Sequence, residues 1–125
     1  MLVYPAIFEQ GTSHVIVRFP DIPAAMTQGE SESEAYEKAE EVLGFALEDY
    51  ETPPTASSIA DIQQKYTNAT VALIGIDLVA YRRKYHSKSI RKNVTVPEWI
   101  NDLATAENIN FSQTLTEALK EKLGV

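Results

Sequence analysis

The densest group of chemically active side chains lies between residues 82 and 92. This basic stretch holds six cationic side chains and no acid: Arg82, Arg83, Lys84, Lys88, Arg91 and Lys92. From residue 89 to 96 polar and apolar residues alternate, which places Arg91, Asn93 and Thr95 on one side of an extended strand. These side chains can hydrogen-bond to base edges, while lysines such as Lys88 and Lys92 attract phosphates. The pattern predicts contact with double-stranded DNA. The alternative is a solvated basic connector that binds nothing.

Acidic side chains dominate the rest of the chain. Residues 1–81 hold 13 acidic and three basic side chains, a net charge of −10, whereas residues 82–125 hold eight basic and five acidic ones, a net charge of +3. An acidic segment is poorly suited to nucleic acid and favours a cationic protein partner. The candidate contact residues are four glutamates on one helical face and two acids in loops: Glu34, Glu37, Glu41, Glu48, Glu9 and Asp21. Alternatively, the helix face is only solvated and Asp21 caps a turn between two prolines.

Residue types typical of catalysis are present but are not clustered. A metal-dependent nuclease needs converging carboxylates, and the aspartates at positions 21, 49, 61 and 77 have no motif-like spacing. His14 and His86 are isolated, there is no cysteine, and the five glycines form no phosphate-binding loop. We therefore expect no catalytic activity, no metal and no cofactor.

The elements that must position the acidic residues form a small α+β domain. Ser31 to Glu34 has the spacing of a capping box, and apolar residues then recur at helical spacing as far as residue 51. Short β-prone runs precede this helix, and the most apolar run in the chain follows it, typical of a strand buried on both faces. The predicted order is β-β-β-α-β, with a further short helix near 57–66: strands at 2–8, 14–19, 24–28 and 70–79, and the long helix at 31–51.

The segment 89–125 has a different pattern of strand, helix and helix. Pro97 suits the start of the first helix, and Asn110 with Gln113 resembles a capping box at the start of the second. Fewer than about 40 residues without a metal or disulfide rarely bury enough surface to fold alone, and a lone strand leaves its backbone unpaired. Two copies that pair their strands solve both problems. The predicted domains are therefore 1–81, a basic linker at 82–88, and a dimerisation domain at 89–125.

This second module resembles the ribbon–helix–helix repressor fold. The resemblance rests on RKNVTVP, EWINDLATAENI and NFSQTLTEALKEKL, which begin at residues 91, 98 and 110. A two-stranded ribbon fits the DNA major groove. In that fold the N-terminus of the second helix clamps a phosphate, as helix N-termini do in general. The resemblance implies this role for Asn110 and Ser112. Thr95 has an alternative role, because with Glu98 it can form a capping box.

The N-terminal module resembles the HicB antitoxins. Its stretch FPDIPAAMTQGESESEAYEKAEEVLGFALEDY is similar to a signature in which Phe-Pro-Asp-x-Pro leads to Thr-x-Gly and a Glu- and Ala-rich helix. The matching positions include Phe19, Asp21, Thr27 and Gly29, while Ala24 departs from the glycine common after the second proline. The resemblance implies a partial RNase H-like fold for residues 1–81.

The resemblance also implies a function. HicB proteins neutralise HicA, a small basic toxin that cleaves mRNA, and the pair represses its own promoter by binding operator DNA. We expect a homodimer through the C-terminal domain, or a tetramer. We expect a cytoplasmic location, because no apolar run approaches the ~18 residues of a membrane helix and the start lacks the pattern of a signal peptide. Two alternatives remain: a stand-alone repressor whose N-terminal domain senses a small molecule, and a nuclease that depends on a carboxylate such as Asp77.

Overall fold

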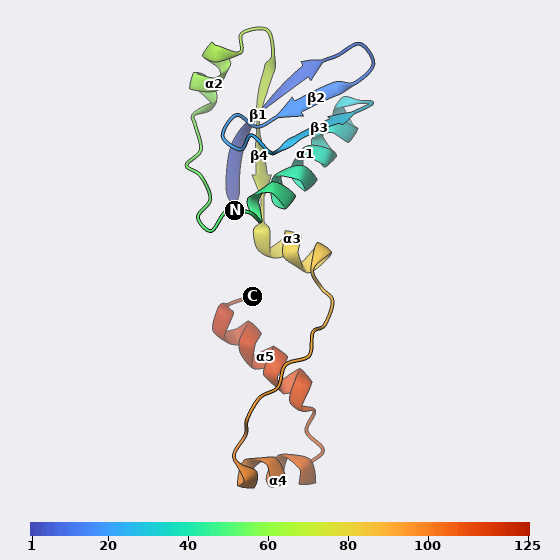
Figure 1. Cartoon of the computed structure of the whole chain (residues 1–125), viewed down its shortest axis with the longest axis vertical. Helices are drawn as coiled ribbons and strands as arrows, with labels where there is room; N and C mark the ends of the chain where they lie inside the picture. Colours follow the sequence, from blue (N-terminus) through green and yellow to red (C-terminus); the bar gives the residue numbers. More distant parts are fainter. The chain divides into compact units, whose positions relative to one another are not determined.

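The computed structural model describes residues 1–125, which divide into two compact units, Met1–His86 and Ser87–Val125. Each unit is described here by itself (Figure 1). The N-terminal unit contains β1 (Leu2–Gln10), β2 (Val15–Arg18), β3 (Met26–Gly29), α1 (Glu32–Leu47), α2 (Ile59–Lys65), β4 (Thr70–Ile76) and α3 (Leu78–Tyr85). The C-terminal unit contains α4 (Glu98–Ala106) and α5 (Phe111–Leu123). The α+β class predicted from the sequence is confirmed.

The four strands form one antiparallel sheet in the order β3-β2-β1-β4. The register places Ile7 of β1 opposite Arg18 of β2, and Tyr4 of β1 opposite Ile74 of β4. The first three strands form where the sequence predicts them. The fourth differs from its prediction, since it ends at Ile76 and lies at the edge of the sheet, where Leu73 is half exposed. It is therefore not buried on both faces.

Helix α1 packs across β2, β3 and β4 and closes the hydrophobic core (Figure 1). Its inner face is made of small and aliphatic residues, including Ala35, Ala39 and Leu43, which are fully buried against sheet residues such as Ala6 and Val17. The predicted N-terminal cap is present, because the Ser31 hydroxyl accepts a hydrogen bond from the Glu34 N–H at 3.2 Å. The helix ends at Leu47, four residues earlier than the apolar periodicity predicts.

The short helix α2 forms as the sequence predicts and packs against β4. It buries Ile62, while Ile7 and Pro5 are buried at the β1 positions that alternate with the core positions Tyr4 and Ala6. Alternate residues of a strand point to opposite faces. Both faces of the sheet are therefore partly covered. The loop before α2 is held by the Tyr4 hydroxyl, which donates to the Pro54 carbonyl at 2.6 Å.

Helix α3 corrects two predictions. The Asp77 carboxylate accepts hydrogen bonds from the N–H groups of Val79 and Ala80, so it caps a helix where the sequence predicted a strand to residue 79. The predicted basic linker at 82–88 is helical as far as Tyr85. The physical reason is a contact with α1: a Cβ on Gly44 would lie only 2.5 Å from the Tyr81 ring, so this glycine lets Tyr81 pack directly on α1.

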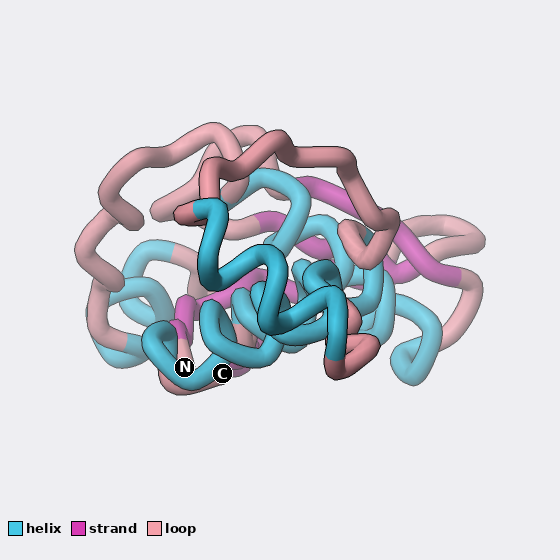
Figure 2. The backbone as a smooth tube through the Cα atoms, turned by 90° about the horizontal axis from the view of Figure 1, so that it is seen from below, coloured by secondary structure: helices cyan, strands magenta, loops and turns pink.

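The C-terminal unit contains two helices and no strand, as the loop colouring around them shows (Figure 2). The strand predicted at 89–96 is an extended loop in the single chain. A lone strand has no neighbour with which to form ladder hydrogen bonds, so this segment has nothing to pair with inside one chain. Asn110 caps α5 by accepting from the Gln113 N–H at 3.0 Å, as predicted. Pro97 is the residue before α4 rather than its first residue.

The close contact between β3 and α1 gives a test of this packing. A Cβ on Gly29 would lie 2.4 Å from the backbone nitrogen of Ala35, so Gly29→Ala forces the strand and helix apart. We expect a loss of about 1–3 kcal/mol in the free energy of unfolding, the usual cost of overpacking, measured by urea denaturation of the whole chain. The control is Gly75→Ala, whose added Cβ meets only the flexible Met1 side chain, at 3.0 Å. Equal midpoints for the two variants would contradict the packing.

Candidate functional site

Several of the acids predicted to bind a partner are already engaged within the N-terminal unit. Glu34 forms an ion pair with Lys38 at 3.0 Å, and this bond, together with the Glu30 N–H, lowers the pKa of the Glu34 carboxyl. Glu48 lies 2.5 Å from the ring nitrogen of His86. Both glutamates therefore help to hold α1 in its place, Glu34 at its start and Glu48 at its end.

The two predicted loop acids also have internal partners. Glu9 lies in β1 rather than in a loop, and its carboxylate pairs with Arg18, whose pKa is raised by this hydrogen bond. Asp21 accepts two hydrogen bonds from Ser57, from the N–H at 2.8 Å and from the hydroxyl at 2.6 Å. Asp21 therefore joins the loop after β2 to the loop before α2.

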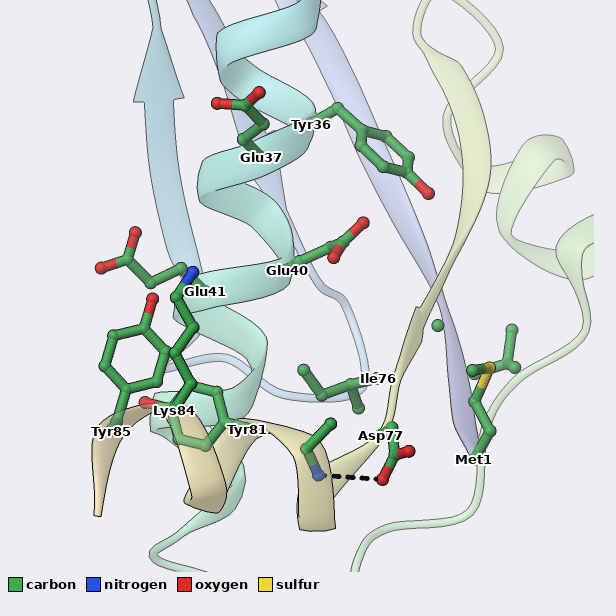
Figure 3. A pocket seen from close by; sticks show the side chains of 13 residues that line it. Met1, Tyr36, Glu37, Glu40, Glu41, Ile76, Asp77, Tyr81, Lys84 and Tyr85 are labelled. Atoms are coloured by element: carbon green, nitrogen blue, oxygen red, sulfur yellow. Dashed lines mark hydrogen bonds between the residues drawn. The ribbon is translucent and has the colours of Figure 1, made fainter. Parts of the chain in front are cut away.

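The remaining predicted acids, Glu37 and Glu41, line an open groove beside α1 (Figure 3). The groove has a volume of about 1070 Å³ and is bounded by α1, α3, the end of β4 and the start of β1. Its polar lining comprises four acids, one base and three tyrosines: Glu37, Glu40, Glu41, Asp77, Lys84, Tyr36, Tyr81 and Tyr85. The fold thus gathers acidic and aromatic side chains on one surface.

The groove contains residues that the sequence analysis missed. Glu40 was not among the predicted contacts, although residues 37, 40 and 41 have the i, i+3, i+4 spacing that places side chains on one helical face. That spacing was the available signal. Tyr81 and Tyr85 enter the groove from α3, which the sequence analysis assigned to a strand and a linker. Nothing in the local pattern indicated that these tyrosines lie beside α1.

Helix α3 brings its aromatic side chains close together. The ring centroids of Tyr81 and Tyr85 are 4.6 Å apart, and the Lys84 ammonium lies 5.3 Å from the centroid of the Tyr85 ring. Burial raises the pKa of the Tyr81 hydroxyl, and the nearby Glu48 carboxylate adds to this shift. Tyr81 therefore anchors α3, whereas Tyr85 is 44% exposed and available to a partner.

The predicted DNA-contacting residues all lie in the C-terminal unit and are exposed. Five of them lie on the extended segment before α4: Lys88, Arg91, Lys92, Asn93 and Thr95. Asn110 and Ser112 lie at the start of α5, where the first N–H groups of a helix have no acceptors within it. Thr95 does not cap α4, since no side chain forms a cap hydrogen bond there.

The structural units also redistribute the charge predicted from the sequence. Because Arg82, Arg83 and Lys84 belong to α3, residues 1–86 hold 13 acidic and six basic side chains, a net charge of −7. Residues 87–125 hold five of each, a net charge of zero. The basic character of the C-terminal unit is thus local, concentrated at Lys88, Arg91 and Lys92.

The apolar residues of the C-terminal unit have no core to enter. None of its residues is buried, and large side chains of both helices are open to solvent, including Trp99 at 66% and Leu103 at 63% exposure. The exposed apolar residues are Ile90, Val94, Val96, Trp99, Ile100, Leu103, Ile109, Phe111, Leu115, Leu119, Leu123 and Val125. An exposed apolar surface of this extent marks a protein interface.

Two further classes of site were sought. No group of three or more His, Cys, Asp or Glu side chains is arranged to hold a metal ion. No helix combines the length and apolar composition that crossing a membrane requires.

Comparison with known proteins identifies the family. Residues 4–118 match the family described as the HicB_like antitoxin of bacterial toxin-antitoxin systems, so the chain belongs to the HicB-like antitoxin family. This confirms the resemblance seen in the sequence. Members of this family are non-enzymatic regulators of toxin–antitoxin systems, and the chain is therefore an antitoxin and not an enzyme.

Individual relatives agree with this assignment. The chain is 28% identical to a chain of a toxin–antitoxin complex from Streptococcus pneumoniae, with a TM-score of 0.54 over 97% of this chain and 98% of the other. It shares the fold of the Burkholderia pseudomallei antitoxin HicB, with 24% identity and a TM-score of 0.57 over 99% and 98% of the two chains. It is also 29% identical, over 77% of its length, to an uncharacterized 14.9 kDa protein from the rep-hol intergenic region of Haemophilus phage HP1, of which it covers 74%.

The two hydrogen bonds of Asp21 predict a structural role for this residue. Asp21→Ala leaves the Ser57 N–H and hydroxyl without their acceptor. We expect the free energy of unfolding to fall by about 2–3 kcal/mol, as for lost hydrogen bonds to a charged group, measured by denaturant titration. Asp49→Ala is the matched control, because the Asp49 side chain is exposed and has no partner in the chain. If both variants are equally stable, Asp21 does not hold the two loops together.

Proposed function

We propose that the chain neutralises a small basic HicA-like toxin through its N-terminal unit and represses its own promoter by binding operator DNA through its C-terminal unit. The toxin is of the mRNA-cleaving kind. The similar Streptococcus pneumoniae chain comes from a toxin–antitoxin complex, which supports a toxin as partner. The net charge of −7 on the N-terminal unit supports a cationic partner, because opposite charges speed encounter and disfavour wrong partners.

The observation that carries the DNA-binding half is the exposed apolar surface of α4 and α5. Both helices are regular, yet nothing in their own chain covers them. A second copy of the unit supplies a matching apolar surface, and it also supplies a strand to pair with residues 89–96. This arrangement is a ribbon–helix–helix dimer. Its ribbon presents Arg91, Asn93 and Thr95 to the major groove.

The backbone contacts of the operator are assigned to other residues. Lys88 and Lys92 flank the reading positions and attract phosphates, so DNA binding should weaken steeply as salt rises. The free N–H groups at the start of α5, around Asn110 and Ser112, suit a phosphate oxygen. Arg82 and Arg83 belong to α3 in the N-terminal unit, so we no longer assign phosphate contacts to them.

Dimer formation is tested by placing a charge in the apolar surface. Leu115→Arg puts a cation where the second copy should pack, and we expect the protein to become monomeric at micromolar concentration in sedimentation equilibrium. Thr116→Arg is the control, because it adds the same charge to the neighbouring position of α5, outside the apolar series. A dimer that survives Leu115→Arg would refute this interface.

The division of labour between the units gives a second test. Arg91→Ala combined with Asn93→Ala removes two reading side chains, each such contact being worth about 1–3 kcal/mol of base discrimination. We expect the variant to lose specific binding to its promoter in a gel-shift assay while it still binds and neutralises the toxin. Lys122→Ala, near the end of α5, controls for loss of one positive charge.

The result also separates the alternatives. The toxin is identified as a stoichiometric basic protein that co-purifies with the tagged chain and arrests growth when expressed alone. Joint loss of both activities by a folded double variant would refute the two-unit proposal. A chain that binds its promoter but has no toxin partner would instead be a stand-alone repressor.

A further inference from the structure

We propose that the groove between α1, α3 and the end of β4 is the surface that receives the toxin, and that it binds arginine or lysine side chains which the toxin presents. This inference rests on the proposed function, since it names the contact site of the same partner. The groove is built by Glu37, Glu40 and Glu41 on one side and by tyrosines on the others (Figure 3).

The first argument is that these three glutamates are unpaired. The other predicted contact acids, Glu9, Asp21, Glu34 and Glu48, each have a partner within the chain. Glu37, Glu40 and Glu41 form no hydrogen bond or ion pair, and the fourth acid of the groove, Asp77, is occupied in capping α3. Like charges at i, i+3 and i+4 of a helix repel one another. A cation that lies among the three carboxylates relieves this repulsion.

The second argument is the aromatic lining. Tyr36 and Tyr85 are each 44% exposed and border the same groove as the glutamates. The face of an aromatic ring attracts ammonium and guanidinium groups. Within the groove this attraction is already in use, since the Lys84 ammonium lies over the Tyr85 ring. The lining therefore suits a basic side chain, which combines an apolar stem with a cationic end.

The third argument concerns the size of the partner. A second hollow of about 450 Å³ shares Glu41, Tyr81 and Tyr85 with the groove. It extends the surface to Phe45, which is 65% exposed, and lies beside Met26 of β3, which is 61% exposed. Exposed aromatic and methionine side chains are typical of protein interfaces. The continuous surface is larger than a small cation needs, so we assign it to a protein.

The test compares two variants that remove the same number of charges. The first, E37Q/E40Q/E41Q, neutralises the groove. The second, E30Q/E32Q/E51Q, neutralises three exposed glutamates that lie outside the groove and whose carboxylates have no partner. Calorimetric titration of the purified toxin into the full chain should show binding about 100-fold weaker for the groove variant and less than about threefold weaker for the control variant. Circular dichroism establishes that both variants are folded.

Three results would overturn the inference. Unchanged affinity in the groove variant would place the toxin elsewhere on the unit. Equal losses in both variants would mean that only the total charge matters. A changed oligomeric mass with unchanged toxin affinity would assign the groove to a contact between copies of this chain.

Failure of the proposed function is distinguishable from these results. If the unmodified chain binds no toxin at all, the proposed function fails and the toxin is not the occupant of the groove. An NMR titration with a blocked arginine-rich hexapeptide then decides the chemistry of the groove by itself. Shifts confined to residues around Tyr36 and Tyr85, and absent with the citrulline analogue, would retain a site for guanidinium groups. Shifts that are absent or spread over the whole unit would overturn it.

Discussion

The close approach of α1 to the sheet and to α3 is the constraint on which the N-terminal unit depends. It requires residues with little or no side chain at the contact points: Ala35 and Ala39 against the sheet, Gly29 against the start of the helix, and Gly44 against Tyr81. Since α1 lies so close to the sheet, its opposite side is free to carry charge. Because α3 lies so close to α1, the tyrosines of α3 face the glutamates of α1. The acidic and aromatic groove is therefore a consequence of small residues in the core.

The C-terminal unit obeys the opposite constraint. Its helices are capped and regular, but none of its residues is buried and its apolar faces are open along their length. Burial of apolar surface is the main favourable term in folding, at roughly 25 cal/mol per Å². A unit that buries almost none of it within one chain must obtain that stabilisation from another. The same physics explains the missing strand, because residues 89–96 can complete a hydrogen-bond ladder only with a second segment.

Local signals in the sequence were sufficient for the elements that depend on local interactions. Helix α1 follows from its cap and its apolar periodicity, and α5 follows from Asn110 and the periodicity after it. Helix α3 was missed because it depends on distant contacts, chiefly that of Tyr81 with Gly44, and because the apolar run before it resembles a continuing strand. The state of each acid was equally hidden. Asp21 and Ser57 are 36 positions apart, and Glu48 and His86 are 38 apart, so no local pattern indicates which carboxylates are paired.

The pairing of the acids separates the charge of the N-terminal unit into two physical roles. Glu9, Asp21, Glu34 and Glu48 are bound to groups in their own chain, and their contribution to stability explains why they are there. Glu37, Glu40 and Glu41 contribute nothing of that kind, since they repel one another beside half-exposed tyrosines. A surface that is unfavourable for the isolated chain and complementary to a cation is better explained by binding than by folding. The net charge of a segment, which the sequence supplies directly, therefore indicates the kind of partner, while the pairing of individual carboxylates indicates where that partner binds.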